Sequence, residues 1–367
     1  MLKRLERAWR LLWIRVLTRL MSRGGTQDSP DWSVRPHRVL FLRHDRIGDM
    51  ILSTGLLRAI ARSHPTIRLD VLASARNATV LRENPHVHSV IVFQRTKPWS
   101  YLTALRRIRR GRYDAVIDCM PTAPSLTALL LILASGARHR IGVAGRGNDA
   151  AFTLAVRPVE GAVHIVDHLG ALATPFGVDL RTADLRPHVY LTDVERTRAD
   201  STWRTHAKHG AGRRLLVNVS VGRPAHRWPD ERFVAAIRHV LARDPTVTVL
   251  VTGARDESAR AARLAADAGA PFVAAGLREA LALVGTADFV FSPNTSIAHA
   301  ASALRRPAVV MCPPDLAARW GLYRSPGYEL ASPGGSLESL SVGPVLEALD
   351  RLLADSEPAR TRAAGGA

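Results

Sequence analysis

Short apolar runs alternate with longer segments of helical spacing along most of this chain. The runs that predict buried strands are residues 39–42, 68–72, 89–93, 115–118, 215–219, 247–251, 289–291 and 308–311. The segments whose spacing predicts helices are residues 51–62, 101–110, 126–133, 229–241, 255–267, 296–304 and 344–353. Because strands that alternate with helices form parallel sheets with crossover connections, the pattern predicts an α/β protein.

The alternation is interrupted between about residues 142 and 194, where glycine and proline make the pattern irregular. We place the connection between two Rossmann-like, doubly wound lobes here, near residue 180. The prediction is a GT-B-like arrangement in which the two lobes face a central cleft and ligands bind beyond the carboxyl ends of the strands. The predicted parts are an N-terminal helix (1–24), a first lobe (36–180), a second lobe (181–355) and a flexible tail (356–367).

Composition narrows the class of protein. The 367 residues are 47% apolar and 23% charged, which is enough to bury two cores. The formal net charge of +19 attracts anionic partners such as a phosphorylated glycolipid surface, a nucleotide or a nucleic acid, although a GC-rich genome also explains the preference for arginine. Basic residues are spread along the chain without an aromatic-and-basic recognition motif, so we expect no nucleic-acid partner.

The two cysteines, Cys119 and Cys312, lie far apart and outside any Cys-x-x-Cys or Cys/His cluster. They predict buried thiols in a reducing compartment rather than a disulfide or a zinc site.

The N-terminal segment has the pattern of a basic amphipathic helix. Its apolar positions recur at helical spacing, and basic residues flank them, but the run is too short to span a bilayer and lacks a cleavage pattern. Such a helix suits an anionic membrane surface. A helix packed on the protein's own body explains the pattern equally well. The first interpretation places the protein in the cytoplasm, at the inner face of the cytoplasmic membrane.

A polar loop after the first predicted strand contains Arg43, Arg46, Gly48 and Asp49 and leads into the first long helix. Gly48 allows a tight turn or the close approach of a ligand. Position alone leaves two roles for Asp49. It is either a carboxylate that caps the helix or a general base that takes a proton from a bound hydroxyl.

A second polar loop follows the first strand of the second lobe and contains Ser220, Arg223, His226 and Arg227. Unpaired amides at a helix start and forked guanidinium groups hold anions, so the loop is either a phosphate site or a solvated basic loop. The neighbouring Trp228 fits packing better than base stacking.

A third loop, with Asn294, Thr295, Ser296 and His299, precedes a predicted helix. Its side chains either cap that helix or hold a diphosphate or a sugar. His299 in the first helical turn is also explained by local hydrogen bonding alone.

Three segments resemble motifs of glycosyltransferase family 9, the heptosyltransferase family. RHDRIGDMILSTGLLRAI (residues 43–60) resembles its opening motif, and HRWPDERF (226–233) resembles its basic Trp-Pro segment. SPNTSIAHAASALRRPAVVMCPP (292–314) resembles its Asp-Thr-Gly-x-x-His helix start and the strand that follows. The resemblance extends from about residue 38 to residue 350, in matching order.

The resemblance implies a GT-B fold and an inverting, metal-independent transfer from a nucleotide sugar, usually ADP-heptose, with no separate cofactor. Asp49 matches the family's proposed catalytic base, and Arg43, Arg46 and Gly48 fall on the acceptor side. The second lobe then binds the nucleotide and its diphosphate through Ser220, Arg223, His226, Arg227, Asn294, Thr295, Ser296 and His299. The acceptor is a sugar of the lipopolysaccharide core or another glycan.

The chain departs from the family pattern at the donor motifs. His226 replaces the usual lysine, Asn294 the usual aspartate and Ser296 the usual glycine, while Cys-Pro-Pro at 312–314 replaces Gly-Pro-Thr. These departures leave two alternatives open: a related transferase with another nucleotide-sugar donor or acceptor, and a catalytically silent relative that binds glycolipid.

Overall fold

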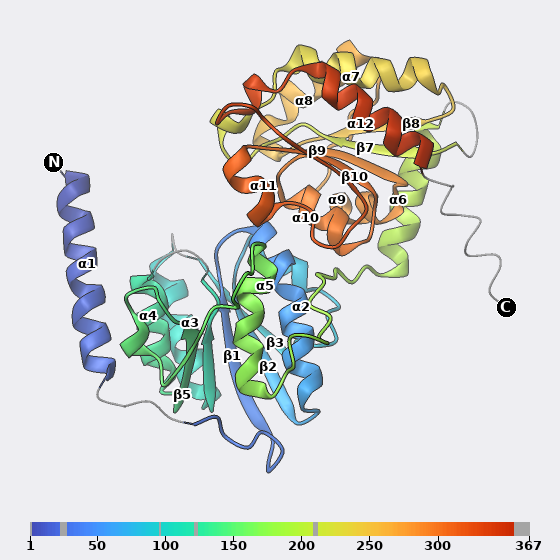
Figure 1. Cartoon of the computed structure of the whole chain (residues 1–367). Helices are drawn as coiled ribbons and strands as arrows, with labels where there is room; N and C mark the ends of the chain where they lie inside the picture. Colours follow the sequence, from blue (N-terminus) through green and yellow to red (C-terminus); the bar gives the residue numbers. More distant parts are fainter. Residues whose placement is uncertain (1, 23–27, 95–96, 121–123, 208–211, 356–367) are drawn as a thin grey trace. The chain divides into compact units, whose positions relative to one another are not determined.

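The computed structural model of the chain (Figure 1) describes residues 2–22, 28–94, 97–120, 124–207 and 212–355. The chain divides into two compact units, Met1–Pro187 and His188–Ala367. The division follows Pro187, whereas the sequence pattern places the connection near residue 180. The predicted tail (356–367) and the end of the predicted N-terminal helix (23–24) lie outside the described residues.

The first unit is built on a six-stranded parallel sheet with the order β3-β2-β1-β4-β5-β6. Its strands are β1 (His37–Arg43), β2 (Ile67–Ser74), β3 (Ser89–Phe93), β4 (Ala115–Asp118), β5 (His139–Val143) and β6 (Leu154–Val156). The direction of the strand order reverses between β1 and β4, where Leu42 pairs with Asp118. At such a switch point, the loops after the two strands diverge and leave room for a ligand.

Helices cover both faces of this sheet. On one face, α2 (Ile47–Ser63) packs with α5 (Ile165–Gly170) and the 3-10 helix η4 (Ala171–Phe176). On the other face, α3 (Pro98–Gly111) packs with α4 (Leu126–Ser135), and α1 (Leu2–Met21) lies outside α4 (Figure 1). The shorter 3-10 helices of this unit are η2 (Ala78–Leu81) and η3 (Asp149–Ala151).

Helix α1 uses only one of its faces for packing. Ile14, Leu17 and Met21 are buried in the core that α3 and α4 form with the sheet, and Arg140 Nη2 donates to the Met21 carbonyl at 3.0 Å. The opposite face of α1 remains exposed. Both interpretations of the N-terminal pattern therefore have a physical basis, since one face packs on the protein's body and the other stays free. Within the described residues, no helix combines the length and apolarity needed to cross a bilayer.

Helix α2 is approached very closely by the segment that ends the first unit. A Cβ atom at Gly55 would lie 2.0 Å from the Leu185 carbonyl oxygen, so only glycine fits. Arg58, one turn along α2, donates to the carbonyls of Asp184 (2.9 Å) and Arg186 (3.0 Å). These contacts fix the chain just before it enters the second unit.

The second unit has a five-stranded parallel sheet with the order β11-β10-β9-β7-β8. Its strands are β7 (Arg214–Asn218), β8 (Thr248–Thr252), β9 (Phe289–Pro293), β10 (Ala308–Cys312) and β11 (Gly327–Ala331). A single parallel bridge between Val251 and Phe272 lies beyond β8, where the first sheet has a full strand. The switch point of this sheet lies between β7 and β9.

The helices of the second unit again form two layers. A continuous apolar core joins the sheet to α7 (Asp230–Arg243), α8 (Ser258–Ala268) and α12 (Val342–Asp355). Helices α6 (Asp193–His206), α9 (Leu277–Thr286) and α10 (Ser296–Ala303) pack with one another, and α11 (Pro314–Trp320) contacts β11. The 3-10 helices are η5 (Pro224–His226), η6 (Arg255–Glu257) and η7 (Leu337–Ser339).

The prediction of two parallel α/β sheets is confirmed, but the sequence pattern missed several elements. The stretch predicted to be irregular contains β6, α5 and η4, and β5 begins just before it. Strand β5 was missed because His139, Arg140 and Gly142 interrupt its apolar run. Helix α6 was missed because Ala199 and Trp203 are its only buried side chains among the described residues. Strand β11 lies at the sheet edge, where its side chains are half-buried or exposed.

Candidate functional site

A fully buried arginine lies at the carboxyl end of β1. The Arg43 guanidinium approaches two carboxylates: Nη1 is 3.4 Å from Asp45 Oδ2, and Nη2 is 3.6 Å from Asp49 Oδ1. It also donates to two backbone carbonyls, from Nε and Nη2 to Asp49 at 3.1 Å and from Nη1 to Cys119. Arg43 therefore joins the loop after β1, the first turn of α2 and the loop after β4. Since it is 0% exposed, it positions protein groups and is not itself a surface for a ligand.

Asp49 is the third residue of α2, and its side chain is 12% exposed. The helix follows Arg46 without a side-chain cap, and the carboxylate of Asp49 faces the Arg43 guanidinium. Gly48 beside it is buried, whereas Arg46 is exposed. Helix α2 therefore has no side-chain cap, and the carboxylate of Asp49 pairs with Arg43 instead.

Two further acids belong to this cluster and were not singled out in the sequence. Burial raises the pKa of Asp45 to about 7; the Arg43 charge opposes this shift, and the Asp49 carboxyl adds to it. Burial also raises the pKa of Asp118, the last residue of β4, to about 6, against the Met120 amide that donates to it. For Asp118 the available signal was a polar residue at the end of a buried strand, and for Asp45 it was a place in the polar loop directly after one.

The prediction that both cysteines are buried thiols is confirmed. Cys119 and Cys312 are both free and buried. Burial raises the pKa of the Cys119 thiol to about 11, so it is neutral beside Arg43. No group of three or more potential metal-ligating His, Cys, Asp or Glu side chains occurs within the described part of the chain.

In the second unit, a buried asparagine joins the two strands at the switch point. Asn218, the last residue of β7, donates from Nδ2 to the hydroxyls of Ser292 (3.0 Å) and Thr295 (3.2 Å) and to the Ser220 carbonyl (3.2 Å). The hydroxyl of Ser220 in turn accepts from the Ala254 amide after β8, at 2.5 Å. The loops after β7, β8 and β9 are thus held together by side chains of which only Ser220 and Thr295 were predicted.

The predicted phosphate loop contains three basic residues in different situations. Arg223 is exposed and His226 is half-buried. Arg227 forms an ion pair with Glu257, a residue that the sequence pattern did not single out. Its charge is already neutralised by the protein, which weakens its case as a phosphate ligand. The loop borders a hollow of about 720 Å³, also lined by Arg260 and Arg263.

Trp228, next in sequence, is a packing residue as predicted. Its side chain is 0% exposed, and its Nε1 donates to the Leu340 carbonyl at 2.8 Å.

The loop after β9 has one satisfied and one unsatisfied polar side chain. Thr295 caps α10 by accepting from the Ile297 amide at 3.3 Å. The Nδ2 atom of Asn294 is buried and has no hydrogen-bond partner within the described residues. Ser296 is half-buried at the first position of α10, and His299 is buried in its first turn. A donor atom without a partner at a helix start is suited to bind an acceptor on a ligand.

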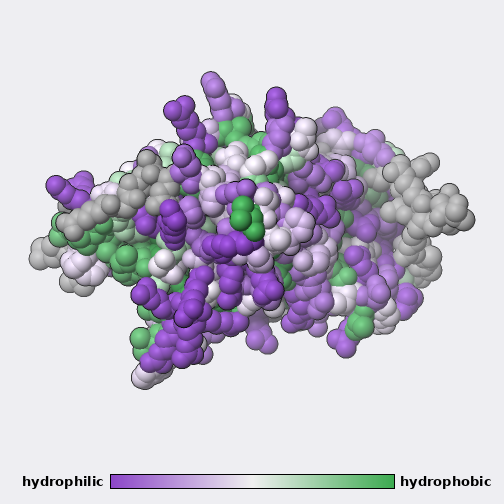
Figure 2. All heavy atoms as spheres, turned by 90° about the horizontal axis from the view of Figure 1, so that it is seen from below, coloured by the Kyte–Doolittle hydropathy of each residue, from purple (hydrophilic) through white to green (hydrophobic). Residues whose placement is uncertain are grey.

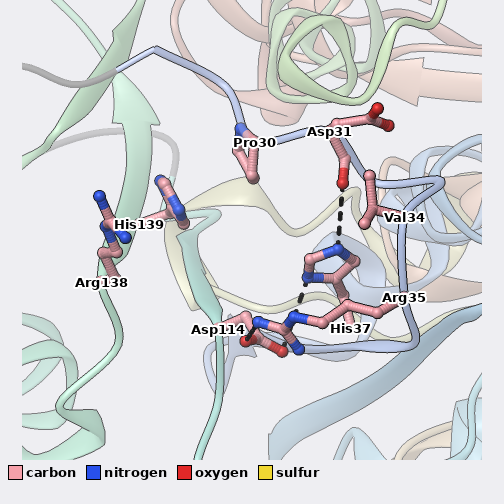
Figure 3. Close-up of a pocket in the computed structure, with 8 residues that line it drawn as sticks. All are labelled: Pro30, Asp31, Val34, Arg35, His37, Asp114, Arg138 and His139. Atoms are coloured by element: carbon pink, nitrogen blue, oxygen red, sulfur yellow. Dashed lines mark hydrogen bonds and ion pairs between the residues drawn. The ribbon is translucent and has the colours of Figure 1, made fainter.

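A cavity of about 300 Å³ lies at the opposite end of the first sheet (Figure 3). His37 and His139 begin β1 and β5, so this cavity lies at the amino ends of the strands. Arg35 forms an ion pair with Asp114 at 2.5 Å, and His37 Nε2 lies 3.2 Å from the Asp31 carbonyl. These contacts join the starts of the strands, and none of the predicted site residues lines the cavity.

Both units thus place polar loops beyond the carboxyl ends of a doubly wound parallel sheet, at its switch point. This arrangement defines a protein of two doubly wound α/β units, each with polar loops where such sheets bind ligands. Comparison with known proteins agrees. The family model described as glycosyltransferase family 9 (heptosyltransferase) matches residues 102–325. The chain belongs to this family.

The similar proteins have low sequence identity to this chain. Lipopolysaccharide heptosyltransferase 3 of Escherichia coli is 23% identical over 278 residues, which cover 71% of this chain and 79% of that protein. The glycosyl transferase family 9 structure from Veillonella parvula DSM 2008 matches with a TM-score of 0.77 and 18% identity, over 88% of this chain and 99% of that one. The E. coli heptosyltransferase WaaC with ADP matches with a TM-score of 0.66 and 20% identity, over 86% and 98%. These structures share the fold of this chain.

Proposed function

We propose that this chain is an inverting, metal-independent glycosyltransferase that moves a heptose from ADP-heptose to a sugar of the lipopolysaccharide core. The observation that carries the proposal is the Asp49 carboxylate, which is held on the buried Arg43 at the switch point of the first sheet. Family membership supports the reaction class. The lipopolysaccharide heptosyltransferase among its relatives and the similar heptosyltransferase structure with ADP support the heptose, the ADP and the lipopolysaccharide.

The proposed step is a single displacement. Asp49 takes the proton of an acceptor hydroxyl while the hydroxyl oxygen forms a bond to the anomeric carbon of the donor. The bond from that carbon to the β-phosphate oxygen breaks, and ADP leaves with the electron pair. Because attack and departure occur on opposite faces of the sugar, the anomeric configuration inverts.

Groups of the second unit are proposed to stabilise the charge that develops on the diphosphate. The start of α10 offers backbone amides, and the side-chain Nδ2 of Asn294 is a hydrogen-bond donor without a partner among the described residues. Arg223 is exposed and available for a forked contact. Arg227 contributes less than the sequence suggested because Glu257 already binds it.

Asn294 also favours a second candidate, a family 9 transferase with a different nucleotide sugar. A carboxylate at this position can only accept hydrogen bonds when ionised, whereas the amide can also donate. The unpartnered Nδ2 therefore suits a donor sugar with an acceptor oxygen at this point. A catalytically silent relative would bind the ligand without turnover.

Asp49→Asn tests the base. We expect transfer from ADP-heptose, followed by chromatography, to fall by ~10²–10⁴-fold. The control is Asp179→Asn, which alters an exposed acid bound to Arg181 and should keep the parental rate. Activity within a few-fold of the parent in Asp49→Asn would exclude Asp49 as the base.

The donor is tested separately by thermal shift with ADP, UDP, GDP and their sugars. A response restricted to ADP and ADP-heptose supports the heptose reaction. A response to UDP or GDP favours the second candidate, and binding without turnover favours the silent relative.

We further propose that α1 attaches the protein to the anionic inner face of the cytoplasmic membrane. Its exposed face carries large apolar side chains at Trp9 (58% exposed), Leu12 (58%), Trp13 (41%) and Leu20 (52%). Hydrophobic side chains gather at the left of Figure 2, the side on which α1 lies in Figure 1. Exposed arginines at positions 10, 15 and 19 complement anionic lipids, at about 1 kcal/mol each. The start of α1 and the loop after β1 lie at the same end of the first sheet (Figure 1), which suits a lipid-linked acceptor.

Co-sedimentation with liposomes that contain anionic lipid tests the attachment. Replacing both tryptophans, Trp9→Ser and Trp13→Ser, spares the buried face of α1 and should reduce the bound fraction several-fold at moderate salt. Val34→Ser with Val194→Ser is the control, since these apolar residues are exposed (75% and 59%) and do not belong to α1. Equal binding of both double variants would contradict the proposal.

A further inference from the structure

We propose that Asp45 and Asp49 act as a coupled carboxyl pair on Arg43, in which Asp45 is a positioning residue that determines how strongly Asp49 accepts a proton. This inference rests on the proposed role of Asp49 as the base. It assigns a function to Asp45, which resemblance and sequence pattern left without one.

The geometry places two negative charges on one positive charge. Nη1 of Arg43 faces Asp45 at 3.4 Å and Nη2 faces Asp49 at 3.6 Å, so the guanidinium bridges the two carboxylates. Both acids are largely shielded from solvent, with side chains 17% and 12% exposed. One arginine cannot neutralise two buried carboxylates, so the fully ionised cluster carries an excess negative charge.

One oxygen of Asp45 shows where a proton fits. Oδ1 is buried and has no hydrogen-bond partner among the described residues, while Oδ2 faces Arg43. A bare buried carboxylate oxygen is costly, whereas a protonated one becomes a donor. The neighbouring Asp49 carboxyl is the group whose proximity adds to the raised pKa of Asp45.

Two further titratable groups beside Arg43 are Asp118, the last residue of β4, and Cys119, which follows it. Asp118 is buried there and adds negative charge, partly balanced by Arg146. The Cys119 thiol stays neutral because burial raises its pKa to about 11. Burial is the largest cause that raises the pKa of Asp45 to about 7, so its ionisation falls in the working range of a cytoplasmic enzyme.

The chemical consequence follows from the charge balance. With a proton on Asp45, the positive charge of Arg43 and the negative charge of Asp49 balance each other. Loss of the Asp45 proton adds a second negative charge, which makes Asp49 a stronger acceptor for the hydroxyl proton of the acceptor sugar. Transfer is therefore expected to accelerate as pH rises through the ionisation of Asp45.

The first test measures the pair without turnover. Carbon-13 NMR of aspartate carboxyl groups follows the titration of the free protein, and Asp45→Asn and Asp49→Asn assign the two signals by difference. We expect the Asp49 signal of the parent to respond to the Asp45 ionisation near pH 7 and to lose that response in Asp45→Asn. Asp118→Asn is the matched control, a buried acid beside the same arginine, and should keep the response. An Asp49 titration unchanged by Asp45→Asn would overturn the proposal.

The second test uses pH–rate profiles. Asp45→Asn should remove the acceleration near pH 7 and lower the plateau kcat by about tenfold, while KM for the donor stays within twofold. Asp45→Glu should restore part of the pH dependence because it restores the carboxyl group. A purely structural role predicts equal losses at every pH and would refute the coupling. If no donor supports transfer, the proposed function fails, but the NMR titration still decides whether the pair is coupled.

Discussion

Asn218 lies with its Nδ2 atom 3.0 Å from the hydroxyl of Ser292, and this hydrogen bond crosses the switch point of the second sheet. The same amide reaches the Thr295 hydroxyl at 3.2 Å, where α10 is capped. One side chain at the end of β7 therefore fixes the loop at the end of β9. The proposed donor site depends on this connection because its ligand groups lie in both loops.

Asn218→Ala should strongly reduce nucleotide binding and lower the stability of the fold only moderately. The substitution leaves two hydroxyls without their shared donor and should lower the free energy of unfolding by about 1–3 kcal/mol. Thermal shift with ADP should show a response reduced by half or more. Asn77→Ala is the matched control: it removes a buried asparagine of the first unit that donates to the Arg43 carbonyl at 3.1 Å. An ADP response that survives in Asn218→Ala as well as in the control would argue against this role.

Glu257→Gln should strengthen the binding of a nucleoside diphosphate. The substitution releases the Arg227 guanidinium from its carboxylate partner, so its charge becomes available to phosphate. A gain of roughly 0.5–1 kcal/mol, or about threefold in Kd for ADP, is expected at low ionic strength. Calorimetry of the double variant Arg227→Ala with Glu257→Gln should show the gain abolished. Unchanged affinity in Glu257→Gln would place Arg227 out of reach of the diphosphate.

Asp118→Asn should stabilise the protein at neutral pH. The folded pKa of Asp118 is about 6, above the ordinary 3.8, so the folded state binds the proton more tightly than the unfolded state. Stability contributed by this group is therefore present below pH 4 and lost as pH rises to 6, a change of about 3 kcal/mol. Urea denaturation should show Asp118→Asn more stable than the parent at pH 8, with the difference shrinking toward pH 4.

Glu195→Gln provides the control of opposite sign. Its hydrogen bond to Arg278 lowers the pKa of Glu195 to about 2, so this carboxylate stabilises the fold above pH 4.5 and loses that effect as pH falls toward 2. The variant should be less stable than the parent at pH 7. A stability difference of the same sign for both variants would contradict the assigned shifts.

Gly55→Ala should destabilise the first unit. The added methyl group would meet the Leu185 carbonyl at 2.0 Å, so α2 or the segment after it must move. Overpacking of this kind costs about 1–3 kcal/mol. Gly343→Ala is the control, since a Cβ there meets no atom within 4 Å. Equal melting temperatures for both variants would show that the segment at 185 is not held against α2.

The sequence by itself determined the architecture and the positions of the site loops. Eight strands were readable because parallel strands, buried on both faces, are continuous apolar runs. The loops after β1, β7 and β9 were identified because polar residues follow those runs directly. Sequence patterns depend on a clear difference between apolar and polar positions. The edge strand β11 and the helix α6, which has a narrow buried face, lack that difference.

Only the tertiary structure decided which charges remain available for chemistry. Arg43 and Arg227 look alike in the sequence, yet one is buried against Asp45 and Asp49 and the other is bound to Glu257, 30 residues away. The pKa of Asp45 is likewise raised by its burial and by the Asp49 carboxyl, and the Arg43 beside it is held by the Cys119 carbonyl, which follows a distant strand. The burial and the ion pairs of a side chain depend on residues that are close in space but distant in sequence. A local sequence pattern does not identify those residues.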